Sequence, residues 1–480
     1  MTTDIVLISP HQPKTAKILR TASGITQPLS ISYIASFLIK NGYSVKIIDN
    51  DIENLTPIDL ETRIRQFNPI SVGITVSTSS TNTAIEIAKI VKKINGEIKV
   101  IAGGIQPTIL PHILLKNNEI DICVMGEGEI TSLELLRAIK YNRDISEING
   151  IAYKKNGEIK ITEPRKLIDN LDELPIPAYE LLPMNRYTLP ASRRLTSYPI
   201  ASVITSRGCP YLCKFCSHNT VFKNKVRFRS PENVLEEMKY LRKKFDVREF
   251  VFWDDSILLD KNRAIKIFNM IKKELPDIYF TCSSRVDHIN EGIAKLMYEA
   301  GCRMILFGAE SGSQKILDSI NKQITVGQTI KAVEICRNNK IMSFCSFIIG
   351  TPEETKETLE ETRRFVLKLD PDFAIFTIFT PLPGSYYFNR LINNGEIDIG
   401  SANWNDYINL LSSSAPAASV NSDLTKEELV YYQKKLFRDF YLRASYILKR
   451  IKKIKNKQMF YQTIRGVKAI IKLEANKFYE

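Results

Sequence analysis

The sequence has few histidines and no long apolar segment. Only 4 of the 480 residues are histidine. No run of about 18 or more apolar residues occurs, so we expect no membrane-spanning helix. Asp4 interrupts the N-terminus before any apolar stretch, which argues against a secretory signal. The 8 cysteines are therefore expected in a reducing, cytoplasmic environment, where structural disulfides are rare.

The composition is that of an ordinary soluble protein, except for its charge distribution. A length of 480 residues predicts several domains with large cores. The content of 44% hydrophobic and 25% charged residues is typical of globular proteins. The net charge of +14 is concentrated at the C-terminus, because residues 434–480 contain 14 Lys or Arg and 3 Asp or Glu. The rest of the chain is nearly neutral.

Three cysteines stand close together after the strand-like run 200–205. Cys209, Cys213 and Cys216 have the spacing Cys-x3-Cys-x2-Cys. Three thiolates on one loop can hold three irons of a [4Fe–4S] cluster and leave the fourth iron open. A zinc site normally uses four protein ligands, and His218 lies too near Cys216 to complete a set easily. Three clustered cysteines also cannot all pair as disulfides, so the spacing favours the iron–sulfur cluster.

The cysteine loop resembles that of the radical S-adenosylmethionine (SAM) enzymes. The match includes the Arg-Gly pair before Cys209 and the aromatic Phe215 before Cys216. The resemblance implies that the open iron binds the amine and carboxylate of SAM, with Phe215 beside this cofactor. One electron then cleaves the sulfonium and yields a 5′-deoxyadenosyl radical, while the protein orients the cofactors and excludes water.

Residues 1–140 are predicted to form a parallel, doubly wound α/β sheet. Apolar strands at 5–9, 44–49, 71–76, 99–102 and 122–125 alternate with helices at 31–41, 59–67, 81–95 and 109–117. Ligands of such sheets bind at the carboxyl ends of the strands. These ends carry the candidate cofactor-binding residues Ser9, Ser77, Gly103, Gly104, Gly126, Glu127 and Gly128. Small residues let a bulky ligand approach the backbone.

This half resembles the Rossmann-like cobalamin (B12)-binding domain that precedes many radical SAM domains. The matching segments are 27–35, 102–111 and 124–129. The motif Asp-x-His-x-x-Gly, which replaces the lower base of cobalamin with a histidine, does not occur. Gln106 stands where relatives often have histidine. The resemblance implies bound cobalamin, and the alternative is a sheet domain that has lost its ligand.

The remaining chain is predicted to contain a linker at 141–199, a radical SAM domain at 200–390 and a basic helical region at 391–480. The linker includes a hairpin at 148–155 and 158–162, around Asn156-Gly157. Strands at 200–205, 249–253, 278–282, 304–308, 343–349 and 373–380 alternate with helices at 231–245, 261–275, 290–300, 326–339 and 353–369. This pattern suits the open (β/α)6 barrel of radical SAM domains, with its chemistry at the strands' carboxyl ends.

The resemblance implies SAM contacts at those strand ends. The candidates are Asp254, Asp255, Ser283, Arg285, Glu310 and Gly350. The two aspartates would accept hydrogen bonds from the SAM ammonium, although loop capping is the alternative. Arg285 would clamp the SAM carboxylate, Glu310 would hold the ribose hydroxyls, and the backbone near Gly350 would meet the adenine.

The other five cysteines are dispersed. Cys123, Cys282, Cys302, Cys336 and Cys345 lie mostly in apolar runs, where buried thiols are common. Core packing is therefore favoured over an auxiliary cluster. Only Cys123 precedes residue 200, which argues against methylthiotransferases, whose relatives carry a second cysteine trio near the N-terminus.

Segments 436–443 and 444–454 of the basic tail are predicted to be helical. Ile447, Ile451 and Ile454 fall on one face, surrounded by Lys and Arg. Such a helix can lie on an anionic membrane surface, and it resembles the C-terminal region of radical SAM/cobalamin proteins acting on lipids or tetrapyrroles. The alternatives are a solvated packing helix and a nucleic-acid surface, but no nucleic-acid-binding motif accompanies it, so no nucleic acid is expected.

These features favour a cytoplasmic, cobalamin-dependent radical SAM enzyme that methylates an unactivated carbon. Its partners would be a small-molecule or lipid-like substrate and a reductant such as flavodoxin or ferredoxin, with peripheral contact at the membrane's inner face. A second hypothesis is non-methylating radical chemistry: ring closure, carbon–carbon joining or oxidation. A third is a non-catalytic iron–sulfur or cobalamin sensor, which the set of SAM-like segments disfavours.

Overall fold

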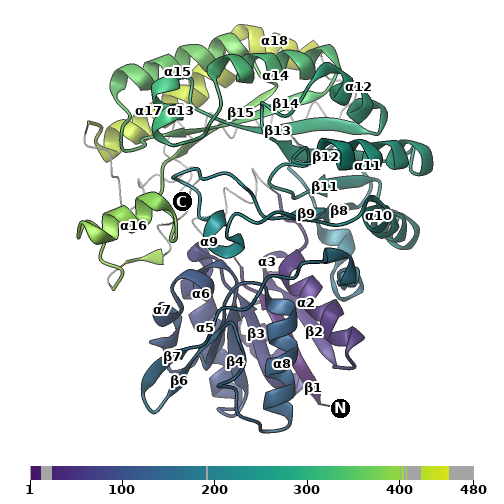
Figure 1. The fold of residues 1–480 in the computed structure, drawn as a ribbon, viewed down its shortest axis with the longest axis vertical. Helices are drawn as coiled ribbons and strands as arrows, with labels where there is room; N and C mark the ends of the chain where they lie inside the picture. Colours follow the sequence, from purple (N-terminus) through teal and green to yellow (C-terminus); the bar gives the residue numbers. More distant parts are fainter. Residues whose placement is uncertain are drawn as a thin grey trace.

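Two β-sheets, stacked along the long axis of the molecule, make up most of the fold (Figure 1). The structure, a computed structural model, describes residues 2–11, 24–190, 193–400, 402–404, 407 and 423–452. The N-terminal sheet has the strand order β2-β1-β3-β4-β5-β6-β7, and the second sheet has the order β15-β14-β13-β12-β11-β8. One continuous hydrophobic core runs between the two sheets.

The first five strands of the N-terminal sheet are parallel, which confirms the predicted doubly wound sheet. They are β1 (Thr3–Ser9), β2 (Val45–Asp49), β3 (Pro69–Thr75), β4 (Lys99–Gly103) and β5 (Ile122–Val124). Helices α2 (Leu29–Lys40) and α8 (Gly128–Lys140) pack on one face, and α4 (Pro57–Phe67) and α5 (Thr81–Ile94) pack on the other. The short α3 (Asn50–Glu53) follows β2. Alternate residues of β1 point to opposite faces, so Ile5 and Leu7 pack towards α2 while Val6 and Ile8 pack towards α4.

The sheet differs from the expectation in two places. The helix expected at 109–117 is two short helices, α6 (Ile105–Ile109) and α7 (Pro111–Leu115). Leu110 leaves the helical region because a residue before proline is disfavoured there. The hairpin β6 (Ile151–Lys155) and β7 (Glu158–Ile161) joins the sheet as two antiparallel strands, so the sheet continues past residue 140.

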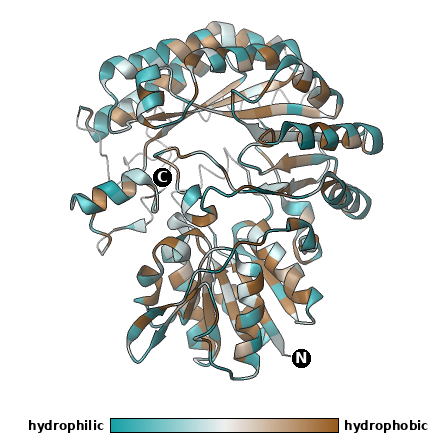
Figure 2. Cartoon of the chain, in the orientation of Figure 1, coloured by the Kyte–Doolittle hydropathy of each residue, from teal (hydrophilic) through white to brown (hydrophobic). Residues whose placement is uncertain are grey.

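The second sheet is an open barrel of six parallel strands in chain order, as predicted. Its strands are β8 (Ile200–Val203), β11 (Glu249–Phe252), β12 (Tyr279–Ser284), β13 (Cys302–Glu310), β14 (Met342–Ile349) and β15 (Phe373–Ile378). Its long outer helices are α10 (Pro231–Phe245), α11 (Lys261–Glu274), α12 (Glu291–Glu299), α14 (Val326–Asn338) and α15 (Lys356–Leu369). Apolar strands lie inside and hydrophilic helix faces point outwards (Figure 2).

Short elements surround the cysteine loop and complete the barrel. The two-stranded sheet of β9 (Ser206–Arg207) and β10 (Arg227–Phe228) encloses the loop and α9 (His218–Phe222). Helix α13 (Gln314–Ser319) follows β13, and α16 (Tyr386–Asn393) follows β15.

Side chains pair with the backbone of β8, which is one edge of the barrel sheet. Gln27, which precedes α2, donates to the Ile200 carbonyl at 2.9 Å and accepts from the Ser202 N–H at 3.0 Å. The Tyr179 hydroxyl donates to the Ser202 carbonyl at 2.7 Å. An unpaired strand edge is a site for aggregation, so these bonds both protect the edge and fix the N-terminal sheet against the barrel.

Helix α17 (Lys426–Tyr441) covers β15, the other edge strand. The Gln433 side chain donates to the Phe376 carbonyl at 2.8 Å, and the Tyr441 hydroxyl donates to the Ala374 carbonyl at 2.7 Å. Phe440 packs behind them and is completely buried. Helix α17 is therefore part of the barrel structure.

Helix α18 (Ala444–Lys452) follows and confirms that this part of the tail is helical. Arg443, which directly precedes this helix, and Lys449 within it both pair with Asp370 of the barrel. Leu448 and Ile451 are 57% and 55% exposed. Ile454 and the rest of the predicted basic segment lie outside the described residues. None of the helices in the described ranges is long and apolar enough to cross a membrane.

Replacing Phe440 by alanine should destabilise the barrel. Removal of a fully buried phenylalanine leaves a cavity, and we expect the free energy of unfolding to fall by about 3–5 kcal/mol. Chemical denaturation of the apoprotein measures the change. Leu448→Ala is the matched control, because this exposed side chain on α18 should change stability by less than about 0.5 kcal/mol. Equal effects of the two variants would contradict the docking of α17.

Candidate functional site

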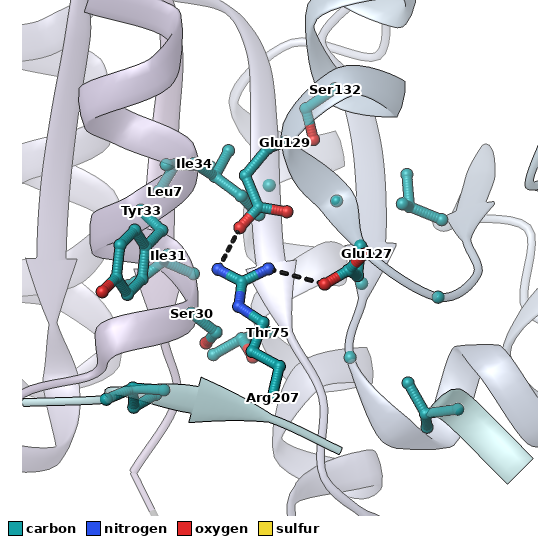
Figure 3. Close-up of a pocket in the computed structure, with 18 of the residues that line it drawn as sticks. Leu7, Ser30, Ile31, Tyr33, Ile34, Thr75, Glu127, Glu129, Ser132 and Arg207 are labelled. Atoms are coloured by element: carbon teal, nitrogen blue, oxygen red, sulfur yellow. Dashed lines mark hydrogen bonds and ion pairs between the residues drawn. The ribbon is translucent and has the colours of Figure 1, made fainter. Parts of the chain in front are cut away.

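A mainly apolar cavity lies between the carboxyl edge of the N-terminal sheet and the start of the barrel (Figure 3). It encloses about 280 Å³. Of the seven candidates at the strand ends of the N-terminal sheet, five line this cavity: Gly103, Gly104, Gly126, Glu127 and Gly128. Ser9 and Ser77 are not among the lining residues. The Ser9 hydroxyl bonds to Asp49, and the Ser77 hydroxyl bonds to Ser80 at 2.9 Å.

Glycines at the carboxyl edge of the N-terminal sheet present no side chains to the cavity. At Gly104 the backbone has a φ of +115°, and an added Cβ would lie 2.8 Å from the Val76 carbonyl oxygen. This position is therefore restricted to glycine. At Gly103 a Cβ would contact only Val124, at 3.9 Å. Leu7 and Ile34 add apolar surface (Figure 3), so the edge offers a flat wall to a large ligand.

This wall fits the cobalamin that the sequence indicates. Gln106, two residues beyond Gly104, is completely buried, and neither atom of its side-chain amide has a hydrogen-bond partner. An unpaired buried amide costs about 1–3 kcal/mol and suits a ligand rich in amide groups. Among the described lining residues, His218 is the one histidine, and it comes from the barrel side. The sheet therefore offers no lining imidazole as a lower axial ligand.

Arg207 crosses the cavity wall and connects the two sheets. Its guanidinium pairs with Glu127 at 2.8 Å and with Glu129 at 2.6 Å (Figure 3). It also lies 5.1 Å from the ring centre of Tyr33. Arg227 pairs with the same Glu127 at 2.7 Å. All four charged groups are buried or nearly so, and removing one partner of such a pair is strongly destabilising because it leaves an uncompensated charge.

Glu127 is held in its charged form by these pairs. Burial acts to raise the pKa of this carboxyl, but the hydrogen bond from Arg227 and the charge of Arg207 outweigh it and hold the pKa below its usual range. The Ile168 N–H also donates to Glu127, at 2.8 Å. The carboxylate that the sequence indicated as a cofactor contact therefore also joins the two domains.

The cysteine loop begins directly after Arg207. Gly208 has a φ of +102°, and an added Cβ would lie 2.0 Å from the Lys225 carbonyl oxygen, so this position accepts no other residue. Cys209, Cys213 and Cys216 are half-buried free thiols. Because only Gly208 separates Arg207 from Cys209, the Arg207 pairs fix where this loop starts.

The three thiols fit a cluster better than a catalytic nucleophile. Burial raises the pKa of each of them, that of Cys216 to about 11, whereas a nucleophilic cysteine needs a lowered pKa. Metal ligands lose their protons on binding. In the described part of the chain, no three His, Cys, Asp or Glu side chains converge as ligands of one metal ion. A four-iron cluster instead spreads its thiolates over separate irons.

The residues suggested for SAM binding lie in two groups. Asp255 lines the cavity and pairs with His218 at 2.8 Å. Phe215, Arg285 and Glu310 gather around Lys322 and are not among the residues that line the cavity. The Lys322 ammonium lies 2.6 Å from Glu310 and 5.7 Å from the Phe215 ring centre. Arg285 donates to the Lys322 carbonyl at 3.1 Å and forms two bonds to Asp287 at 2.9 Å each.

Three further candidates have structural partners. Asp254 is buried and accepts hydrogen bonds from the Thr205 and Ser206 hydroxyls, and burial raises its pKa. It therefore caps the segment that leads into the cysteine loop. Ser283 lies half-buried near the end of β12, where its carbonyl accepts from the Ile257 N–H at 3.0 Å. Gly350 donates to Glu354 and lies against Leu429 of α17.

Sequence reasoning missed several polar and aromatic groups of the site. Trp253 lines the cavity, is 46% exposed, and donates from its indole nitrogen to the Ser202 hydroxyl at 2.9 Å. Arg207 stood beside Cys209 in the sequence, but its partners lie 78–80 positions away. Lys322 belongs to no local pattern.

The dispersed Cys282 and Cys302 are buried and hydrogen-bonded to each other, which suits core packing.

Comparisons with known proteins match this two-part geometry. A family model for the radical SAM superfamily matches residues 203–366, and one for the B12 binding domain matches residues 16–136. An uncharacterized methyltransferase of Pyrococcus horikoshii is 40% identical over 448 residues, which are 93% of this chain and 94% of that protein. The anaerobic magnesium-protoporphyrin IX monomethyl ester cyclase of Rubrivivax gelatinosus is 30% identical over 78% of this chain and 68% of that protein.

The chain belongs to the cobalamin-binding radical SAM enzymes. Its fold agrees with that of the radical SAM methyltransferase TsrM from Kitasatospora setae, solved with cobalamin and a [4Fe–4S] cluster bound. The TM-score is 0.71 at 16% identity, over 99% of this chain and 100% of that one. The family uses a [4Fe–4S] cluster, SAM and cobalamin as cofactors, so the protein is an enzyme, and the sensor hypothesis is not supported.

Gly103→Leu should block the cavity without unfolding the protein. The added Cβ has room beside Val124, so the rest of the side chain extends into the cavity where cobalamin is expected. We expect loss of cobalamin from the purified protein, with unchanged iron content and an unchanged melting temperature of the cobalamin-free protein. Gly96→Leu is the control, since a Cβ there meets nothing within 4 Å. Unchanged cobalamin content in Gly103→Leu would show that this edge is not the binding wall.

Proposed function

We propose that the protein transfers a methyl group from SAM to a carbon atom of a small-molecule substrate. One observation supports this most directly. The bare glycine edge of the B12-type sheet and the segment that carries the cysteines line the same cavity. A substrate entering from the barrel would thus meet both cofactor sites. The extent of the Pyrococcus match, over 93% of this chain, supports the same assignment.

Cys209, Cys213 and Cys216 are proposed to hold the cluster, with Gly103, Gly104, Gly126 and Gly128 forming the cobalamin wall. When bound, the cluster and SAM supply a carbon radical and the cobalamin supplies the methyl group. The chain's own residues hold the two sites in register. Arg207 fixes the beginning of the cysteine loop against Glu127 and Glu129. Trp253 and the apolar sheet edge exclude water from the space between them.

The residues around Lys322 are proposed to receive SAM. Arg285 and Glu310 lie together on the barrel side of the cysteine loop, where a carboxylate clamp and a ribose-binding carboxylate would be needed. To bind the SAM carboxylate, Arg285 would exchange part of its pairing with Asp287. Glu310 already accepts a hydrogen bond from Lys322, and its second oxygen would serve the ribose.

Non-methylating radical chemistry is the second candidate. It is favoured by the match to the Rubrivivax cyclase at 30% identity. Both candidates need the same cofactors and a one-electron donor, such as flavodoxin or ferredoxin, so they differ only in the fate of the methyl group.

Contact with the inner face of a membrane through α18 is a further part of the proposal. The exposed Leu448 and Ile451 support it. Arg443 and Lys449, however, are already paired with Asp370, so the charge available to an anionic surface would have to come from the rest of the tail. Vesicle sedimentation of the full chain, with Leu448→Ser/Ile451→Ser as the comparison, measures this contact.

The test of methyl transfer uses SAM with a trideuterated methyl group. The protein, purified without oxygen and supplied with cobalamin and a reductant, is incubated with a small-molecule extract of its native cells. We expect a product that gains the deuterated methyl group, together with S-adenosylhomocysteine and 5′-deoxyadenosine. Deoxyadenosine with an unlabelled product would instead support the non-methylating candidate.

Two variants separate the cofactor roles in this assay. Cys213→Ala should abolish both SAM products, because one iron loses its ligand. Gly103→Leu should still form deoxyadenosine but no labelled product, since only the cobalamin wall is blocked. A labelled product formed at the normal rate by Gly103→Leu would refute the role proposed for the cavity.

A further inference from the structure

Lys322 is a buried cation beside the cysteine loop. Its side chain is 11% exposed, and its ammonium lies 2.6 Å from Glu310, whose side chain is 7% exposed. The ammonium also lies 5.7 Å from the ring centre of Phe215, the residue directly before Cys216. Exposed charges are screened by water and salt, whereas a charge at this depth acts strongly on its surroundings.

The segment that carries Lys322 is tied to the cysteine loop. The Lys214 N–H donates to the Ile320 carbonyl at 3.0 Å, and the Asn321 side chain donates to the Leu212 carbonyl at 2.8 Å. Arg285 holds the carbonyl of Lys322 from the other side, at 3.1 Å. The backbone of residues 320–322 is therefore held against the cysteine loop, and Glu310 holds the ammonium at the end of the Lys322 side chain.

Backbone strain accompanies this arrangement. Glu310 has a φ of +61°, at a register shift in β13, and Gln323 next to Lys322 has a φ of +56°. Left-handed backbone at such residues costs of order 1 kcal/mol and is often kept at functional sites. The strain at Glu310 places its carboxylate against Gly308, where an added Cβ would lie 2.3 Å from Glu310 Oε1 and 2.7 Å from Lys322 Nζ.

The charge of Lys322 reaches the cysteines. The Lys322 ammonium, the Glu310 carboxylate and the Arg285 guanidinium all lie near enough to Cys213 for their charges to act on its sulfur. Burial acts to lower the pKa of Lys322 itself, but Glu310 and Cys213 outweigh it, so the ammonium stays charged.

We propose that Lys322, with Glu310 as its counter-charge, sets the reduction potential of the cluster held by Cys209, Cys213 and Cys216. The inference rests on the assignment of the cluster to these cysteines. Adding an electron makes the cluster more negative, and net charge near a cluster is one of the factors that fix its potential. A fixed ammonium favours the reduced form, and Glu310 opposes it. Lys322 thus acts on the cluster through its charge and does not touch the reacting atoms.

The test is a potentiometric titration of the reconstituted protein, followed by EPR of the reduced cluster, without substrate. Lys322→Met should shift the midpoint to a more negative potential, because the cation is lost. Glu310→Gln should shift it to a more positive potential. The midpoint potential of the double variant should lie between those of the single variants, since the two substitutions together remove no net charge. The midpoint potential of Lys322→Arg should stay near that of the wild type, because the positive charge is kept.

Lys315→Met is the matched control for the loss of one positive charge. Lys315 lies on the neighbouring α13 but is exposed, so its removal should shift the midpoint several-fold less than Lys322→Met. Equal shifts in these two variants, or no shift in Lys322→Met, would overturn the proposal. If Lys322→Met assembles no cluster, the Glu310→Gln titration decides, and an unchanged midpoint there overturns it. A wild-type protein without a cluster signal would refute the cysteine assignment instead.

Discussion

The salt bridges of Arg207 and Arg227 with Glu127 and Glu129 join the two halves of the molecule at the place where the cofactor sites meet. The carboxylates belong to the turn that starts α8, at the carboxyl edge of the N-terminal sheet. The arginines belong to the small sheet that encloses the cysteine loop. Because only Gly208 stands between Arg207 and Cys209, the position of Arg207 determines where the cysteine loop begins. Most other features of the site depend on this contact.

The same contact explains how a cavity persists between two packed domains. The core that runs between the sheets is apolar and would favour closer packing, while the glycine edge has no side chains to resist it. Buried ion pairs have strict geometry and therefore hold the spacing of the two walls. Gln27 and Tyr179 add hydrogen bonds to the first barrel strand, so the domains are connected by polar contacts of defined direction. A methyl donor and a radical generator need this kind of fixed separation.

Much of the fold could be predicted from the sequence because its signals are local. Apolar runs between helical periodicities indicated both sheets, and the Cys-x3-Cys-x2-Cys spacing indicated the cluster loop. The glycine-rich strand ends indicated four glycines and Glu127, which all line the cavity. Pro111 separates α6 from α7 where one helix was expected at 109–117, because helical geometry is disfavoured for the residue before a proline. The hairpin at 151–161 was expected, but its addition to the sheet depends on a long-range pairing that local patterns do not encode.

The parts of the site that sequence reasoning missed are the long-range pairs. Arg207 and Glu129 are far apart in the chain, and no local sequence pattern around either residue indicates that they pair. Arg285 and Glu310 were recognised as candidates. Lys322, which lies between their side chains in space, was not, because a single lysine after a short helix belongs to no recognisable motif. The Asp254 carboxyl accepts hydrogen bonds from the Thr205 and Ser206 hydroxyls. These contacts become evident only when β8 and β11 are placed side by side in the sheet.

The claim that both cofactor sites open onto one cavity can be tested directly by EPR. The protein is loaded with cob(II)alamin and the cluster is reduced, so that both centres carry unpaired electrons. The structure predicts a magnetic interaction that alters both signals, because Arg207 and Gly208, which directly precede the cysteines, line the same cavity as Gly103. Two unperturbed signals, identical to those of protein loaded with either cofactor alone, would contradict the account.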